Sequence, residues 1–248
     1  FRGTTHHFAL PKTLVQRLSD LSRQQGTTLF STLMTAYHIL LSRLSGQDEI
    51  LVGSPAAGRT KASWERLVGY FLNPIVVRAP IERGATFVEL LGKVRQSLLG
   101  GVAHQDFPFP LMVERLHPPR DAGRSPLFQA AVSWDTPRRW SSSDGAKSLA
   151  SGDGRGSDEA GTLGLRPFLL GQQGAAFDLM LMMLYDGECI TAALQYNTDL
   201  FDDSTVTRWS EHYQTLLESI VADPQAAVHR LPLLTAEQRR KIVYDFNA

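Results

Sequence analysis

Three short stretches of the chain hold side chains of the kinds that bind substrates or move protons. Residues 68–73 read Val-Gly-Tyr-Phe-Leu-Asn, residues 104–109 read His-Gln-Asp-Phe-Pro-Phe, and residues 120–128 read Arg-Asp-Ala-Gly-Arg-Ser-Pro-Leu-Phe. Imidazole, carboxamide, carboxylate and guanidinium groups can donate or accept hydrogen bonds, so the three stretches hold the first candidate site residues.

Each candidate also has a structural interpretation. Asn73 interrupts apolar sequence, and a buried carboxamide needs partners; these are either a substrate or backbone groups at a strand bend. His104 and Gln105 either border a binding cleft or form a corner between two helices, with Asp106 as the N-cap of a helix that begins at Pro108. Both interpretations stay open for all four residues.

The third stretch favours a structural role. Arg120, Asp121 and Arg124 are predicted to form a buried ion-pair network that fixes a loop, with substrate contact as the alternative. Arg59, in a polar connection, is either a solvated arginine or part of a site. Asp178 lies in an otherwise apolar strand and must be paired if it is buried.

Composition limits the classes of function. The chain has 248 residues, with 25 basic and 25 acidic side chains, so no net charge favours nucleic acid or an anionic membrane. The single cysteine, Cys189, excludes an internal disulfide and a multi-cysteine zinc site, and is compatible with a reducing cytoplasm. No apolar run is long enough to span a bilayer, and we expect a cytoplasmic piece of a larger protein.

Helices and strands are predicted from periodicity and capping residues. Apolar residues at helical spacing predict a helix from Pro11 to Gly26 and a buried helix from Thr28 to about Leu44. The predicted strands are residues 8–10, 50–53, 71–77, 127–134, 177–184 and 190–196, and the other predicted helices are 86–102, 108–116, 202–220 and one beginning at 235. Asp186-Gly187 joins the last two strands as a hairpin. The alternation predicts one α/β sandwich around a mixed sheet.

One segment departs from this composition. Residues 137–162 are rich in Ser, Gly, Asp and Lys and nearly devoid of apolar residues, which predicts a flexible insertion. Strands resume directly after it, so it interrupts a domain and does not separate two. The predicted organisation is one domain over residues 1–230, followed by the start of a linker over residues 231–248.

The three stretches, in this order and at this spacing, resemble the C-terminal half of condensation domains from nonribosomal peptide synthetases. Weaker similarities lie at residues 1–11, 46–55 and 58–59, and residues 231–235 resemble the linker toward an adenylation domain. The sequence departs from the family pattern in three places, with Pro74 for Thr, Pro110 for Glu, and Gly123 and Ser125 in the third stretch.

The resemblance implies a fold like chloramphenicol acetyltransferase, in which a mixed sheet covered by helices forms one lobe of a two-lobed domain. It implies amide formation between a donor acyl or peptidyl thioester and an acceptor aminoacyl thioester. The implied partners are the N-terminal lobe, donor and acceptor carrier proteins and an adenylation domain. No cofactor is implied to bind directly; the carriers' phosphopantetheine arms deliver the substrates. Asn73, Arg59, His104 and Gln105 would line the tunnel between the lobes.

The family's catalytic signature, His-His-x-x-x-Asp-Gly, is absent from the chain. His6-His7 is followed by Phe-Ala-Leu-Pro-Lys, so the pair is expected to be two strand residues. The isolated lobe is therefore expected to be inactive, with no catalytic residue and no metal site of its own. Two alternatives remain: an epimerisation or heterocyclisation lobe, against which Asn73 after Gly-Tyr-Phe argues, and a non-catalytic docking or scaffold module.

Overall fold

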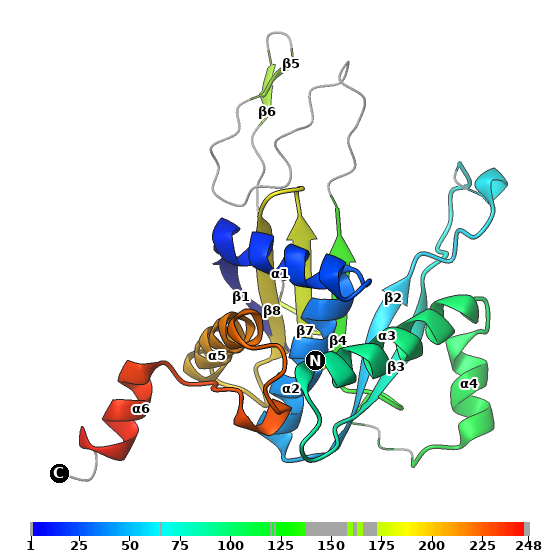
Figure 1. Cartoon of the computed structure of the whole chain (residues 1–248). Helices are drawn as coiled ribbons and strands as arrows, with labels where there is room; N and C mark the ends of the chain where they lie inside the picture. Colours follow the sequence, from blue (N-terminus) through cyan, green and yellow to red (C-terminus); the bar gives the residue numbers. More distant parts are fainter. Residues whose placement is uncertain are drawn as a thin grey trace.

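A six-stranded mixed sheet forms the centre of the molecule (Figure 1). The computed structural model describes residues 2–64, 66–119, 121, 123–136, 158–160, 163–165 and 173–245. The strands lie in the order β1-β8-β7-β4-β2-β3. Their bounds are β1 Gly3–Leu10, β2 Glu49–Ala56, β3 Asn73–Pro80, β4 Ala130–Asp135, β7 Leu179–Tyr185 and β8 Ile190–Asn197. Strand β4 runs parallel to its neighbours β2 and β7, and the other pairs are antiparallel.

Four helices pack together on one face of this sheet. They are α1 (Lys12–Gln24), α2 (Leu29–Ser45), α3 (Phe87–Ala103) and α5 (Asp203–Ala222). Helix α2 lies at the centre and is apolar on most of its surface, and ten of its residues in succession, 31–40, are buried. The predicted buried helix is therefore confirmed. Helix α4 (Phe109–Leu116) lies beyond the β3 edge, and α6 (Ala236–Val243) lies near the C-terminus (Figure 1). Two short 3-10 turns are η1 (Ala62–Trp64) and η2 (Val228–Arg230).

Threonine side chains cap the N-termini of three of the six described α-helices. The Thr28 side chain accepts a hydrogen bond from the Ser31 N–H, and Thr86 forms a capping box with Glu89, as predicted. Two predictions about helix starts are wrong. Pro11 is the N-cap of α1 and not part of its first turn, and the N-cap of α4 is Pro108, so Asp106 caps nothing. In both helices the N-cap proline has an extended backbone, with ψ of 137° and 129°, and makes no side-chain capping hydrogen bond.

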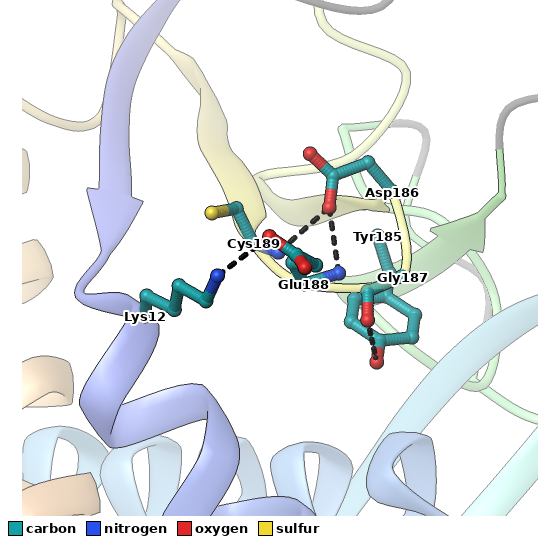
Figure 2. A network of polar contacts seen from close by, with 6 residues as sticks. All are labelled: Lys12, Tyr185, Asp186, Gly187, Glu188 and Cys189. Atoms are coloured by element: carbon teal, nitrogen blue, oxygen red, sulfur yellow. Dashed lines mark hydrogen bonds and ion pairs between the residues drawn. The ribbon is translucent and has the colours of Figure 1, made fainter.

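The β7–β8 hairpin turns at Asp186-Gly187, as predicted (Figure 2). The Asp186 carboxylate accepts hydrogen bonds from the N–H groups of Cys189 (2.6 Å) and Glu188 (2.8 Å), and these donors lower the pKa of Asp186. Gly187 supplies a positive φ of 106°. An ion pair of 2.6 Å between Lys12 and Glu188 attaches the turn to the start of α1.

Several strand boundaries differ from the prediction. Strand β1 begins at Gly3 and not at Phe8, β2 continues to Ala56, and β7 begins at Leu179. Two further strands begin later than predicted. The strand predicted over 71–77 is β3 and begins at Asn73, and the strand predicted over 127–134 is β4 and begins at Ala130. In the second case Leu127 has a φ of 69°, and the N–H of Phe128 donates to the carbonyl of Pro126 at 2.9 Å. This tight turn uses the residues that a longer strand would need.

The predicted insertion over residues 137–162 lies largely outside the described residues. Its described part is strand β5 (Asp158–Ala160), which pairs antiparallel with β6 (Leu163–Leu165). The flexibility of the segment stays a prediction. Among the described helices, none is long and apolar enough to cross a membrane.

Candidate functional site

The sheet has a second face, opposite the four helices, and strand register fixes what lies on it. Alternate side chains of a strand point to opposite faces, so paired residues share a face. His7 pairs with Ala193, Ala193 with Met182, and Met182 with Ser133, so these four residues form one row across β1, β8, β7 and β4. The row combines one exposed imidazole with small, flexible or hydroxyl-bearing side chains, and the side chain of Ser133 is nearly buried.

The second face differs from the covered face in its contacts. The main core contains the strand residues of the covered face, such as Leu181, Met183 and Leu194, whereas buried residues of the second face, such as Ala193, lie outside that core. Half-buried apolar side chains continue across the second face; they are Leu51, Val76, Met180, Met182 and Leu184. A sheet covered by helices on one side but apolar on both is typical of a surface that another layer covers.

Aromatic rings close one end of the second face. Only glycine fits at position 53, because a Cβ there would lie 2.1 Å from the nearest atom of the Phe128 ring. The Phe128 ring in turn contacts Phe109 from α4 (5.5 Å between centroids) and Phe177 before β7 (5.3 Å). The tight turn at Leu127 immediately precedes Phe128 and sets the direction of its side chain, so the positive φ of Leu127 helps to shape the second face.

A projecting segment, residues 57–72, joins β2 to β3, and we call it the arm (Figure 1). Arg59 donates to the carbonyl of Trp64 and places its guanidinium 4.2 Å from the centre of the Phe71 ring. The Trp64 and Phe71 rings are 6.2 Å apart. Gly58 is required here, because its φ is 63° and a Cβ would lie 1.9 Å from the Phe71 carbonyl oxygen. Cation–π and ring contacts therefore hold the two sides of the arm together.

Large apolar side chains lie exposed along the arm. Val68 and Tyr70 are 104% and 86% exposed, and Leu67 and Leu72 are 50% and 47% exposed. All four lie within the six consecutive residues 67–72. Large apolar side chains exposed close together are typical of surfaces that contact another protein.

Asn73 holds together the corner between α3 and α4. Its Nδ2 donates to the carbonyls of Gln105 and Phe107, both at 2.7 Å, and its Oδ1 accepts from the N–H of Phe109 at 3.0 Å. The carboxamide of Asn73 thus forms hydrogen bonds with backbone groups. This agrees with the structural interpretation of Asn73 given above. His104 is the exposed C-cap residue of α3, and Gln105 donates to the carbonyl of Val102 at 3.0 Å. The structure brings Asn73 and Gln105 together, while Arg59 belongs to the arm.

A comparison with protein families gives a match over residues 1–243 to the model described as "Condensation domain". The chain belongs to the condensation-domain family. It is 36% identical to one of the linear gramicidin synthase proteins of Brevibacillus parabrevis over 99% of this chain and 3% of the relative. It is also 36% identical to chondramide synthase cmdD of Chondromyces crocatus over the whole of this chain and 6% of the relative. The chain therefore spans a small part of the synthetases that it matches.

Solved structures confirm the condensation-domain fold. A four-domain nonribosomal peptide synthetase, AB3403 in its holo form with AMP and glycine, matches with a TM-score of 0.84 and 25% identity over 96% of this chain and 18% of that one. The first condensation domain of the CDA synthetase matches with a TM-score of 0.73 and 21% identity over 95% of this chain and 49% of that one. The chain thus corresponds to about half of a solved condensation domain, as predicted from its sequence.

The predicted ion-pair network of this condensation-domain chain is not buried. Asp121 and Arg124 lie 3.6 Å apart with side chains 61% and 69% exposed, and Arg120 lies outside the described residues. Such exposed pairs contribute little to stability. The Asp121 carboxylate also accepts from the Gly123 N–H at 2.8 Å, so it shapes the loop locally. Asp178 is half-buried, and burial raises its pKa against the opposing effect of Arg124.

The two histidines that resemble part of the missing signature lie on β1, as expected. His6 points to the covered face, where its ring nitrogens lie 3.1 Å from Ser210 Oγ and 3.3 Å from Thr207 Oγ1 of α5. His7 points to the second face and is exposed. Adjacent strand residues face opposite ways, so the pair cannot act as one unit.

Sequence reasoning missed two parts of the candidate site. One is the row across the second face, because Ser133 and Met182 lie 49 positions apart in sequence and meet only through the parallel pairing of β4 with β7. The other is the contact of Phe128 with Gly53. The only local signal was Gly53 itself, since a glycine inside a strand marks a close approach.

Proposed function

We propose that this chain forms one wall of a condensation-domain active site. The complete domain would join a donor acyl or peptidyl thioester to the amine of an acceptor aminoacyl thioester, both delivered on the phosphopantetheine arms of carrier proteins. The observation that carries the proposal is the second face, whose row of imidazole, small, apolar and hydroxyl side chains faces away from the helices. Such a surface binds an extended substrate and excludes water once a companion layer covers it.

The companion layer is proposed to be the N-terminal lobe of the same domain. The arm supports this, because its exposed apolar residues need a partner and its internal contacts hold it in an extended shape. Arg59 would then stiffen the arm where it reaches the companion lobe, and Asn73 would hold the adjoining corner. His104 and Gln105 would lie at the border of the tunnel. These roles position the wall and do not require chemistry from the four residues.

The chain by itself is proposed to be inactive. Attack of an amine on a thioester needs a group that handles the amine proton and donors for the oxyanion. The row offers the Ser133 hydroxyl, which is a poor proton acceptor near neutral pH, and the exposed imidazole of His7, which lacks the Asp-Gly of the family's signature. The proton-handling group would come from the His-His-x-x-x-Asp-Gly signature of the companion lobe. A neighbouring adenylation domain belongs to the same proposal and is supported by the four-domain synthetase that was solved with AMP and glycine. A cytoplasmic location is also proposed, because the single cysteine is compatible with a reducing compartment.

A second candidate function is a docking module. The observation that favours it is the same fold in an X-domain from teicoplanin biosynthesis, solved in complex with OxyB, with a TM-score of 0.78 and 21% identity. In a docking module the second face would remain, but amide synthesis would be absent even in the two-lobed protein. An epimerisation or heterocyclisation lobe would instead give a stereoisomerised or cyclised product.

The test joins this chain to its upstream lobe as one polypeptide. Donor-loaded and acceptor-loaded carrier proteins are added, and products are identified by mass spectrometry. We expect the amide from the two-lobed protein and none from this chain alone. Replacing the second histidine of the companion's signature by alanine is the matched control and should abolish the product. A folded two-lobed protein that makes no amide across several donors would favour the docking module, and amide from this chain alone would contradict the half-site.

A further inference from the structure

A cavity of about 450 Å³ opens where the parallel strands β2, β4 and β7 begin. Its walls include Glu49, Ala130 and Leu179, the first residues of these strands, together with side chains from α2 and α5. The arm follows the last residue of β2, so the cavity and the arm lie at opposite ends of the strands. Its volume lies in the range of cavities that hold small molecules.

The charges around this cavity leave one carboxylate without a counter-ion in the described part of the chain. Glu49 is paired with Arg78, and Arg124 is paired with Asp121. Asp178 also lines the cavity and has no ion pair among the described residues. Its backbone is fixed on both sides, because its N–H donates to Gln129 at 3.0 Å and its carbonyl accepts from Asn197 at 3.1 Å.

Burial raises the pKa of Asp178, even though nearby Arg124 acts in the opposite direction. The carboxylate has therefore lost solvation that its described neighbours do not replace. A cation that enters the cavity would supply the missing charge in a partly desolvated place, where an ionic hydrogen bond is stronger than at the surface.

The remaining wall is aromatic and aliphatic. Phe201 and Trp209 line the cavity and pack edge to face, with centroids 4.9 Å apart, and Leu41 and Leu127 complete the apolar lining. Aromatic faces favour both a ring and an organic cation. The cavity thus offers the Asp178 carboxylate beside an apolar and aromatic surface.

We propose that this cavity binds a small organic cation: a primary ammonium group carried on an apolar or aromatic body. Asp178 is the counter-ion, and Phe201 and Trp209 form the wall that takes the apolar part. The site lies at the end of the strands opposite the arm, and Leu51 of its lining also belongs to the second face. The proposal rests on this cavity alone and does not rest on the proposed amide synthesis.

The experiment titrates the 248-residue chain with 2-phenylethylammonium chloride and, separately, with its neutral isostere 2-phenylethanol. Binding is followed by chemical-shift changes in backbone and indole N–H resonances. We expect the ammonium ion to bind with a Kd of about 1 mM, the range of a weak fragment, and about tenfold more tightly than the alcohol. The shifts should include the Trp209 indole.

Two variants separate the specific site from general charge attraction. Asp178→Asn should weaken the ammonium ion about tenfold and leave the alcohol unchanged. Glu218→Gln removes a carboxylate from an exposed position on α5 and should change neither affinity. Equal binding of the two ligands to the unmodified chain would overturn the proposal without any variant. Unchanged ammonium affinity in folded Asp178→Asn, or no binding at about 10 mM, would also overturn it.

Discussion

The two faces of the central sheet are built by the same strands and differ in almost every other respect. Along β7 the residues Leu181 and Met183 are 1% exposed and belong to the main core, while Met180 and Met182 are half-buried and lie outside it. The covered face is closed by four helices, and the second face carries half-buried apolar side chains and the exposed His7. One face therefore stabilises the fold, and the other leaves an apolar surface that the proposed companion lobe would cover.

The largest expected effect distinguishes adjacent positions on β7. Leu181→Ala should destabilise the chain by about 2–5 kcal/mol, because it leaves a cavity in the closed core. Met182→Ala should cost less than about 1.5 kcal/mol, because its side chain is already partly solvated. Urea unfolding followed by circular dichroism measures both. Equal losses at the two positions would remove the distinction between the faces.

A smaller effect is expected where the second face is packed most tightly. Gly53→Ala places a methyl group against the Phe128 ring and should cost about 1–3 kcal/mol through overpacking. Gly92→Ala is the matched control, since nothing lies within 4 Å of its Cβ in helix α3, and it should stabilise the chain by about 0.5–1 kcal/mol. Thermal unfolding of both variants gives the comparison. A neutral Gly53→Ala would show that the aromatic end of the face is loose.

The corner beside the arm should respond to loss of its carboxamide. Asn73→Ala leaves two carbonyls and one N–H of the α3–α4 corner without their partner, at a cost of about 1–3 kcal/mol. We expect faster hydrogen exchange at Phe109 than in the unmodified chain, with helix α2 unchanged, by mass spectrometry of peptic fragments. Unchanged exchange at the corner would assign Asn73 to substrate contact alone.

The smallest effect is a pH dependence that belongs to the covered face. His38 is fully buried, with Nδ1 2.8 Å from the Met34 carbonyl, and burial lowers its pKa. The unfolded chain then binds a proton that the folded chain does not, so stability should fall as pH drops below about 6.5, the unfolded value. His38→Gln should remove this part of the decline between pH 7 and 5. Identical slopes of stability against pH in both proteins would contradict it.

Local signals in the sequence predicted the elements of the covered face well. Thr28 and Thr86 begin helices because hydroxyl capping is a short-range interaction, and Asp186-Gly187 closes the hairpin for the same reason. The strand starts at Asn73 and Ala130 were missed, because apolar residues continue into the turns before them. Apolar continuity cannot distinguish a strand from an adjoining loop.

The candidate site was predictable only in part, because its contacts are distant in sequence. Asn73 was singled out as a polar residue among apolar ones, but its partners lie 32 to 36 positions away and are set by the packing of α3 and α4. The pair Asp121–Arg124 was expected to be buried, but it is exposed. The prediction failed because residue spacing does not show which elements cover a loop. Prediction of the second face would have required the order of the strands in the sheet, which the periodicity of a sequence does not give.

The central claim is that the second face is covered by a companion lobe, and methionine oxidation tests it most directly. Hydrogen peroxide is applied to this chain alone and to the two-lobed polypeptide, and sulfoxide at each methionine is measured by peptide mass spectrometry. We expect Met180 and Met182 to oxidise in the chain alone and to be protected in the two-lobed protein, while buried Met183 resists in both. Equal oxidation rates of Met180 and Met182 in the two proteins would contradict the account.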